Sequence, residues 1–228
     1  MNIVIIGGGE PGKFGNDFAL RMRNDGHHVY IISHKDYKTS HPHDIVANFS
    51  TVQEVIDSFN EVTKNVDIID MIIFNSNNGS YPGHASCFTS TSTVDLARWE
   101  ATSRIGNYIP HALGIEALKR MKEDSKIIFM ISRMAVEFDR TSCTDLAGYA
   151  GTKAIQAHMM LAFAEHNNKG AISTAIAPHF VYESPDTYKQ VFELMYNYIN
   201  NITKQNNGKI MCVNAGANPP RMFPYINT

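Results

Sequence analysis

The stretch IVIIGGGEPGKFG, residues 3–15, lies at the start of the chain and decides the fold. Its first four residues form an unbroken apolar run, which is typical of a strand buried on both faces of a parallel sheet. Glycines follow directly, among them those at 7, 9, 12 and 15, and Phe14, Phe18 and Met22 then recur at helical spacing. A strand, a glycine-rich turn and a helix start in this order predict a site for the pyrophosphate of a dinucleotide.

Glycine suits this turn because it allows the chain to reverse tightly and allows the backbone to approach a phosphate closely. The first turn of the helix adds unpaired N–H groups and the positive end of the helix dipole. The alternative is a plain strand-to-helix turn without a ligand, because so short a motif is weak evidence by itself. The residues of this stretch predicted to bind the cofactor are Gly7, Gly9, Gly12, Lys13, Phe14 and Gly15.

Length and composition limit the possibilities. A chain of 228 residues suits a single domain, here residues 1–228, with a substantial core. The formal net charge of −2 argues against nucleic acid or an anionic membrane as partner, and no apolar run approaches membrane-spanning length. The three cysteines are far apart, odd in number and without metal-ligand spacing. This pattern argues against a disulfide framework and is typical of a protein in the reducing cytoplasm. We predict no metal site, because the histidines at 34, 41 and 43 have no standard ligand spacing.

Strand and helix patterns alternate along the chain. Helices are predicted at about 15–24, from 52 after a capping box at 50–53, at 94–121 with a kink or break at Pro110, at 146–166 and at 185–203. Strands are predicted at 3–6, 29–32, 44–47, 68–74, 127–131, 172–177 and 209–213. Alternation of this kind with apolar strands predicts an α/β fold, a Rossmann-type doubly wound parallel sheet of about seven strands. The tail from about 215 is predicted to be irregular.

The most informative pair of polar residues is Tyr149 and Lys153, which are four apart and therefore share one face of a helix. A free tyrosine titrates near ~10, and a neighbouring cation lowers that pKa toward neutrality, where a phenol can exchange protons. Ser132 follows the strand predicted at 127–131 and could donate a hydrogen bond to an oxygen that gains negative charge. Alone, such a pair is more often a solvated helical face.

Taken together, these motifs resemble the short-chain dehydrogenase/reductase family over essentially the whole chain. The resemblance depends on the glycine stretch, on DMIIFNSN at 70–77, on KIIFMIS at 126–132, on Tyr149 and Lys153, and on ISTAIAP at 172–178. Two departures are an Asn-Ser-Asn where the family usually has Asn-Ala-Gly, and a Pro-His where it usually has Pro-Gly. A third is a 17-residue separation of Ser132 from Tyr149, longer than usual.

The resemblance implies catalytic roles for four residues. Tyr149 would exchange a proton with the substrate oxygen, Lys153 would hold the nicotinamide ribose and assist the tyrosine, and Ser132 would orient the carbonyl. The family also uses an asparagine on the helix after the fourth strand to support a water relay to the lysine. Asn107 is the candidate here, although Gly106 aligns with that position equally well.

The resemblance also implies how the cofactor is held. Family members that prefer NAD end the second strand with an acidic residue, whereas this chain has Ser33, His34 and Lys35. A hydroxyl and two cations suit a 2′-phosphate, so we predict NADP(H) rather than NAD(H). Asn48 matches a position that contacts adenine. The further predicted cofactor contacts are Asn75, Ser76, Asn77, Tyr149, Lys153, Pro178 and Phe180.

We therefore predict an NADP(H)-dependent oxidoreductase of the carbonyl reductase or alcohol dehydrogenase type, acting on a small-molecule carbonyl or alcohol. The alternative is a non-catalytic NAD(P)-binding sensor or scaffold of the same fold. A sugar-nucleotide epimerase or dehydratase is disfavoured, because those enzymes usually have a larger C-terminal region. The resemblance further implies a homodimer or homotetramer.

Overall fold

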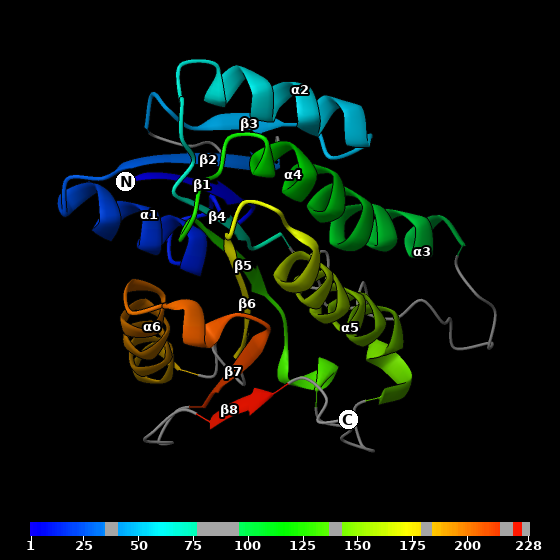
Figure 1. Cartoon of the computed structure of the whole chain (residues 1–228). Helices are drawn as coiled ribbons and strands as arrows, with labels where there is room; N and C mark the ends of the chain where they lie inside the picture. The colour runs from blue at the N-terminus through cyan, green and yellow to red at the C-terminus, as the bar shows by residue number, and fades with distance from the viewer. Residues whose placement is uncertain (35–40, 77–95, 137–142, 179–183, 215–220, 225–228) are drawn as a thin grey trace.

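The structure is a computed structural model that describes residues 1–34, 41–76, 96–136, 143–178, 184–214 and 221–224. These residues form one twisted sheet with helices on both faces (Figure 1). The strands are β1 (Asn2–Ile6), β2 (His28–His34), β3 (Ile45–Ala47), β4 (Met71–Phe74), β5 (Lys126–Met130), β6 (Ile172–Pro178), β7 (Lys209–Val213) and β8 (Arg221–Pro224). The helices are α1 (Phe14–Asn24), α2 (Val52–Thr63), α3 (Leu96–Ser103), α4 (Ile109–Leu118), α5 (Cys143–His166) and α6 (Pro185–Asn200).

The strand order is β3-β2-β1-β4-β5-β6-β7-β8, and the first seven strands are parallel. This confirms the predicted doubly wound parallel sheet. The chain builds outward from β1 to β3 and then returns to the other side of β1 with β4, so the order reverses between β1 and β4. In such sheets, ligands bind at the carboxyl ends of the strands beside this reversal.

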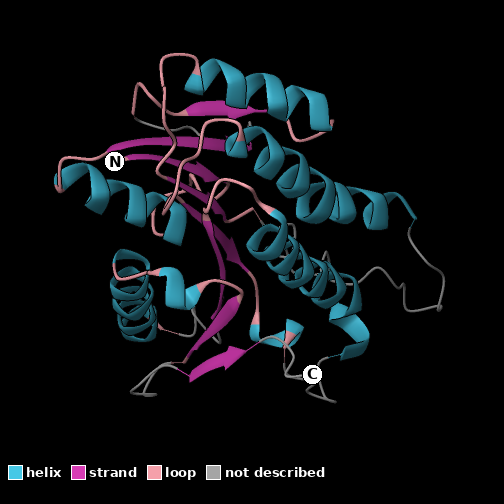
Figure 2. Ribbon diagram, viewed as in Figure 1, coloured by secondary structure: helices cyan, strands magenta, loops and turns pink. Residues whose placement is uncertain are grey.

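Helices lie on both sides of the sheet (Figure 2). A layer of buried apolar side chains fills the space between the sheet and the helices on each side. On one face, Phe59 of α2, Leu113 of α4 and Met160 of α5 pack against Ile72 and other strand residues. On the other face, the buried side chains of α1 and α6 pack together against the same strands. Because both faces are covered, the central strands consist largely of buried apolar residues, as the sequence predicted. Among the described helices, none combines the length and apolarity needed to cross a bilayer.

The structure differs from the predicted elements at three places. The sheet has an eighth strand, because part of the tail predicted to be irregular forms β8 and pairs antiparallel with β7. The helix predicted over 94–121 is interrupted by a π-helical turn at Arg104–Tyr108, and Pro110 lies in the first turn of α4, where its missing N–H costs least. The capping residue of α2 is Thr51, whose Oγ1 accepts from Glu54 N at 3.2 Å, and not the predicted Ser50.

Candidate functional site

The glycine-rich turn is closed by backbone crowding. Gly7 and Gly8 have φ of +89° and +76°, a region that favours glycine. A Cβ at Gly7 would lie 2.5 Å from the Cα of Ser76, and one at Gly15 would lie 2.8 Å from the carbonyl oxygen of Gly7. The start of α1 therefore packs directly on the end of β1, beside the end of β4. A side chain at Gly7 would displace the backbone at Ser76, and one at Gly15 would push the start of α1 away from the glycine turn.

The end of α1 that faces this turn has the features of an anion site. Lys13 is the N-cap residue, and its side chain makes no capping hydrogen bond to this end of the helix. Gly12 has a φ of +75°, and a Cβ there would meet no atom within 4 Å among the described residues. Open space beside a helix N-terminus without a side-chain cap fits a pyrophosphate. The side chain of Phe14 is buried against Phe18 and Phe192, so only its main-chain N–H could serve the predicted cofactor.

The predicted site for the adenosine end is described only in part. Ser33, near the end of β2, is fully buried, and its Oγ has no hydrogen-bond partner among the described residues. The backbone of His34 ends β2, whereas Lys35 lies outside the described residues. Asn48 follows β3, and its Oδ1 accepts from Ser50 N at 3.1 Å and from Ser50 Oγ at 2.5 Å, so this amide already organises the turn before α2.

Lys153 lies at the carboxyl ends of the central strands. It is 3% exposed, and its Nζ donates to the carbonyl oxygen of Met130 at 2.8 Å, to Gln156 Oε1 at 3.0 Å and to the carbonyl oxygen of Ser76 at 3.5 Å. These carbonyls belong to the last residue of β5 and to the second residue after β4. Burial lowers the pKa of Lys153 from 10.5 to about 7. The lysine predicted from its spacing to Tyr149 therefore lies at the carboxyl ends of two central strands.

Tyr149 lies one turn before Lys153 on α5 and is partly buried. The lysine Nζ is 5.9 Å from the centroid of the tyrosine ring, within cation–π range. Ser132, 9% exposed, caps the short 3₁₀ turn Arg133–Ala135 after β5, and its Oγ accepts from Met134 N at 3.3 Å. The structure brings Tyr149 and Lys153 together. It places Ser132 two residues beyond the strand end that holds the ammonium.

The π-helical turn carries both candidates for the fourth catalytic position. The main-chain carbonyl of Gly106 accepts from Gln156 Nε2 at 2.7 Å, and a Cβ at Gly106 would lie only 1.8 Å from Thr152 Cγ2. Asn107 is buried, and its Oδ1 has no partner among the described residues. Ser76 connects the turn to β4, because its Oγ donates to the carbonyl oxygen of Ile105 at 3.4 Å.

The remaining predicted cofactor residues follow the ends of β4 and β6. The side chain of Asn75 points into the glycine turn, since a Cβ at Gly8 would lie 2.1 Å from Asn75 Nδ2. Gly9 is buried in the same turn, and Pro178 is the last residue of β6. Asn77 and Phe180 lie outside the described residues, as does His179.

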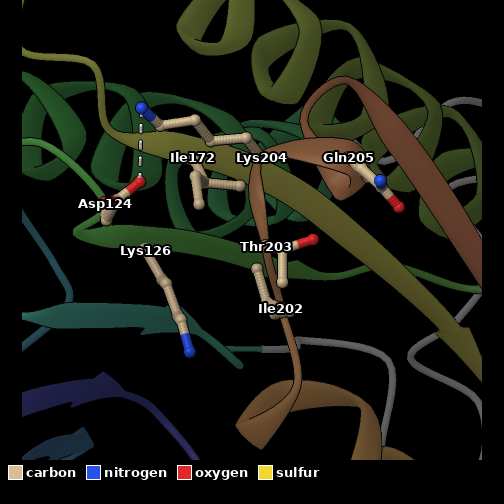
Figure 3. Close-up of a pocket in the computed structure, with 7 residues that line it drawn as sticks. All are labelled: Asp124, Lys126, Ile172, Ile202, Thr203, Lys204 and Gln205. Carbon is tan, nitrogen blue, oxygen red and sulfur yellow. Dashed lines mark ion pairs between the residues drawn. The ribbon is translucent and has the colours of Figure 1, made fainter.

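A hollow on the surface lies at the opposite end of the sheet (Figure 3). It is lined by Lys126 and Ile172, which begin β5 and β6, and by Asp124 and Lys204. Asp124 Oδ1 and Lys204 Nζ lie 3.8 Å apart and form an ion pair. Lys126 Nζ donates to the carbonyl oxygen of Ile199, in the last turn of α6, at 3.2 Å. Burial lowers the pKa of Lys126. Because this hollow lies at the amino ends of the strands, it is separate from the site around Lys153 at their carboxyl ends.

The fold is similar to that of known structures, although the sequence matches no family. No protein-family model and no curated protein matches the sequence. A short-chain dehydrogenase/reductase from Serratia marcescens is similar in structure with a TM-score of 0.74 at 14% identity, over 94% of this chain and 96% of that chain. A short-chain dehydrogenase from Burkholderia cenocepacia in complex with NADP gives 0.71 at 16%, over 94% and 97%. A 4-hydroxyisoleucine dehydrogenase complexed with NADH gives 0.71 at 14%, over 95% and 98%. The chain therefore has the fold of the short-chain dehydrogenase/reductases.

Sequence reasoning missed the residue that connects the parts of this site. Gln156 is fully buried on α5 and contacts both Lys153 and the π-helical turn. A signal was present, because a polar residue lies three positions after Lys153 on the face of the helix that points to the sheet. Its partner at Gly106 is 50 residues away in the sequence, so the pairing depends on the tertiary structure.

Proposed function

We propose that this protein is an NADP(H)-dependent oxidoreductase that transfers hydride between the nicotinamide and a carbonyl or alcohol carbon. The observation that carries the proposal is the position of Tyr149 and Lys153. They lie on successive turns of α5, with the ammonium bonded to main-chain carbonyls at the ends of β4 and β5. A protein that only held a nucleotide would not need a phenol and a buried ammonium together at this place.

The comparisons add support for the cofactor. Of the three similar structures described above, two are described as complexes with NADH or NADP. The start of α1, where the N-cap side chain makes no capping hydrogen bond, and the glycine turn would hold the pyrophosphate of such a dinucleotide through main-chain N–H groups. When bound, the nicotinamide supplies or accepts the hydride.

The residues of the protein would transfer the proton and orient the oxygen of the substrate. Tyr149 donates its phenolic proton to the oxygen during reduction and removes it during oxidation. The positive charge of the Lys153 ammonium, 5.9 Å from the ring centroid, would stabilise the phenolate form of Tyr149. Ser132, through its Oγ, hydrogen-bonds the same oxygen and orients it. Asn107 is proposed as the supporting asparagine, on the strength of its buried Oδ1 without a described partner.

The preference for NADP(H) is supported by the residues that end β2. Ser33, His34 and Lys35 supply a hydroxyl and two basic groups where an acidic residue would repel a 2′-phosphate. Affinities for NADP and NAD, measured for the wild type and for Lys35→Ala, test this part. We expect the variant to lose affinity for NADP selectively. An unchanged preference for NADP over NAD in this variant would show that Lys35 does not bind the 2′-phosphate.

A substrate screen tests the proposed oxidoreductase activity. NADPH is mixed with a panel of aldehydes, ketones and quinones, and the loss of nicotinamide absorbance is followed. Turnover of at least one carbonyl class is expected. Tight NADPH binding without turnover of any member would instead favour the non-catalytic sensor of the same fold.

We further propose that the protein is a homodimer or homotetramer, formed through the helices on the α4 and α5 side of the sheet. Large apolar side chains are exposed there: Trp99 on α3, Tyr108 in the π-helical turn, Ile115 on α4 and Ile155 on α5. Apolar side chains gathered on one side of a molecule are typical of an interface. Analytical ultracentrifugation should show a dimer or larger assembly, and Ile155→Asp should dissociate it.

A further inference from the structure

We propose that Gln156 is a positioning residue for Lys153. Its carboxamide joins the lysine ammonium to the π-helical turn before α4 and fixes the ammonium beneath the ring of Tyr149. The structural part of this inference is independent of the reaction. Its catalytic consequence depends on the proposed oxidoreductase function.

Both ends of the Gln156 carboxamide are used. Oε1 accepts from Lys153 Nζ at 3.0 Å, and Nε2 donates to the carbonyl oxygen of Gly106 at 2.7 Å. The ammonium can only donate and the carbonyl can only accept, so these two partners define the orientation of the amide. The side chain is fully buried, so neither bond competes with bulk water.

The Gly106 carbonyl needs such a donor because of the local sequence. In a regular α-helix, a carbonyl accepts from the N–H four residues later, and for Gly106 that residue is Pro110, which has no N–H. The chain forms a π-helical turn at this point, with Ile109 N donating to the carbonyl oxygen of Arg104. Gln156 supplies a donor from α5 to the carbonyl that proline leaves without its usual partner.

Lys153 needs Gln156 for a complementary reason. The ammonium is buried, and among the described residues its other acceptors are two main-chain carbonyls, Met130 at 2.8 Å and the more distant Ser76 at 3.5 Å. Tyr149 is the titratable group that faces it from its own helix. Burial alone accounts for its lowered pKa, and no described carboxylate contributes.

The amide has an advantage over a carboxylate at this position. A glutamate would accept from Lys153 equally well, but its negative charge would cancel the charge of the ammonium. The neutral carboxamide stabilises the ammonium and leaves its positive charge to act on the phenol of Tyr149. The carboxylate would also lack an N–H for the Gly106 carbonyl.

The test measures the titration of Lys153 directly, without substrate or cofactor. The full-length protein is labelled with ¹³C-lysine, and the ¹³Cε resonance of Lys153 is assigned by its loss in Lys153→Arg. We expect Gln156→Met to lower the pKa of Lys153 by about one unit, because the ammonium loses an acceptor. Gln156→Glu should raise it by a similar amount. Met160→Leu, a buried change one turn along α5, should leave it unchanged.

Equal titration curves for Lys153 in the wild type and in Gln156→Met would overturn the inference and leave Gln156 as packing only. Should Gln156→Met fail to fold, Gln156→Glu decides alone, and an unshifted pKa in that variant has the same meaning. In the catalytic readout, the acidic limb of kcat/KM for alcohol oxidation should move to higher pH in Gln156→Met. A wild type without activity would count against the proposed function, whereas the titration of Lys153 judges the role of Gln156 separately.

Discussion

Gly106 and Thr152 face each other with no room for a side chain between them, since a Cβ on Gly106 would lie 1.8 Å from Thr152 Cγ2. This approach brings the π-helical turn against α5 one turn before Gln156. It explains how the Gln156 side chain reaches the Gly106 carbonyl. The contact between these two helical segments therefore determines the geometry around Lys153.

Gly106→Ala is expected to destabilise the protein by about 1–3 kcal/mol, the usual cost of overpacking a closed contact. Urea denaturation followed by circular dichroism measures this free energy of unfolding. The matched control introduces the same change into Thr152→Ser, which keeps the hydroxyl and removes the methyl group that clashes. There the added cost should be much smaller, and equal costs in the two backgrounds would show that this contact is not the cause.

Tyr149→Phe is expected to remove at least 99% of any oxidoreductase activity, about a hundredfold or more, because it deletes only the phenolic hydroxyl that exchanges the proton. The affinity for NADPH, measured by fluorescence titration, should remain within about threefold of the wild type. Loss of NADPH binding would mean that Tyr149 supports the nucleotide site and not the proton transfer.

Lys153 should make the stability of the protein depend on pH. Its pKa is near 10.5 when exposed and about 7 in the folded protein, so between these values the unfolded chain binds more protons. The folded state of the wild type therefore gains stability as the pH rises from about 7 to about 10. Lys153→Met lacks this group. The free energy of unfolding of Lys153→Met minus that of the wild type should therefore be larger at pH 7 than at pH 9.5, which means that the variant is relatively more stable at pH 7.

Denaturation of the two proteins at both pH values provides this comparison. Lys119→Met, which changes an exposed lysine on the surface of the molecule, is the control. Its difference from the wild type should be the same at the two pH values. A pH-independent difference for Lys153→Met would show that the folded and unfolded pKa values of Lys153 are similar.

The buried ion pair between Arg23 and Asp44 should contribute more to stability than the exposed pair between Arg21 and Glu193. Asp44 Oδ1 also accepts from Ile31 N at 3.1 Å, and the exposed fractions of the Arg23 and Asp44 side chains are 15% and 3%. Asp44→Ala leaves a largely buried guanidinium without its carboxylate and is expected to cost about 3–5 kcal/mol. Glu193→Ala, in a pair that is 39% and 45% exposed, should cost about 0–1 kcal/mol. Similar costs in chemical denaturation would contradict this ranking.

Sequence reasoning predicted the sheet well because its signals are local. The apolar run at 3–6, the glycines behind it and the later apolar strands each identify their element without reference to a partner. The elements it missed depend on contacts or competing bonds. The π-helical turn arises where Pro110 removes a hydrogen-bond donor, and β8 forms in the proline- and asparagine-containing tail where it pairs with the edge strand β7.

The sequence by itself determined the order of strands and helices and the spacing of Tyr149 and Lys153, because periodicity and glycine placement act over a few residues. The tertiary structure decided the environment of Lys153: the carbonyl of Met130 from one strand, that of Ser76 from another, and Gln156 bonded to a turn 50 residues away. The physical reason is that burial and hydrogen bonding determine the charge state of an amine. Both depend on which distant segments the folded chain places around it.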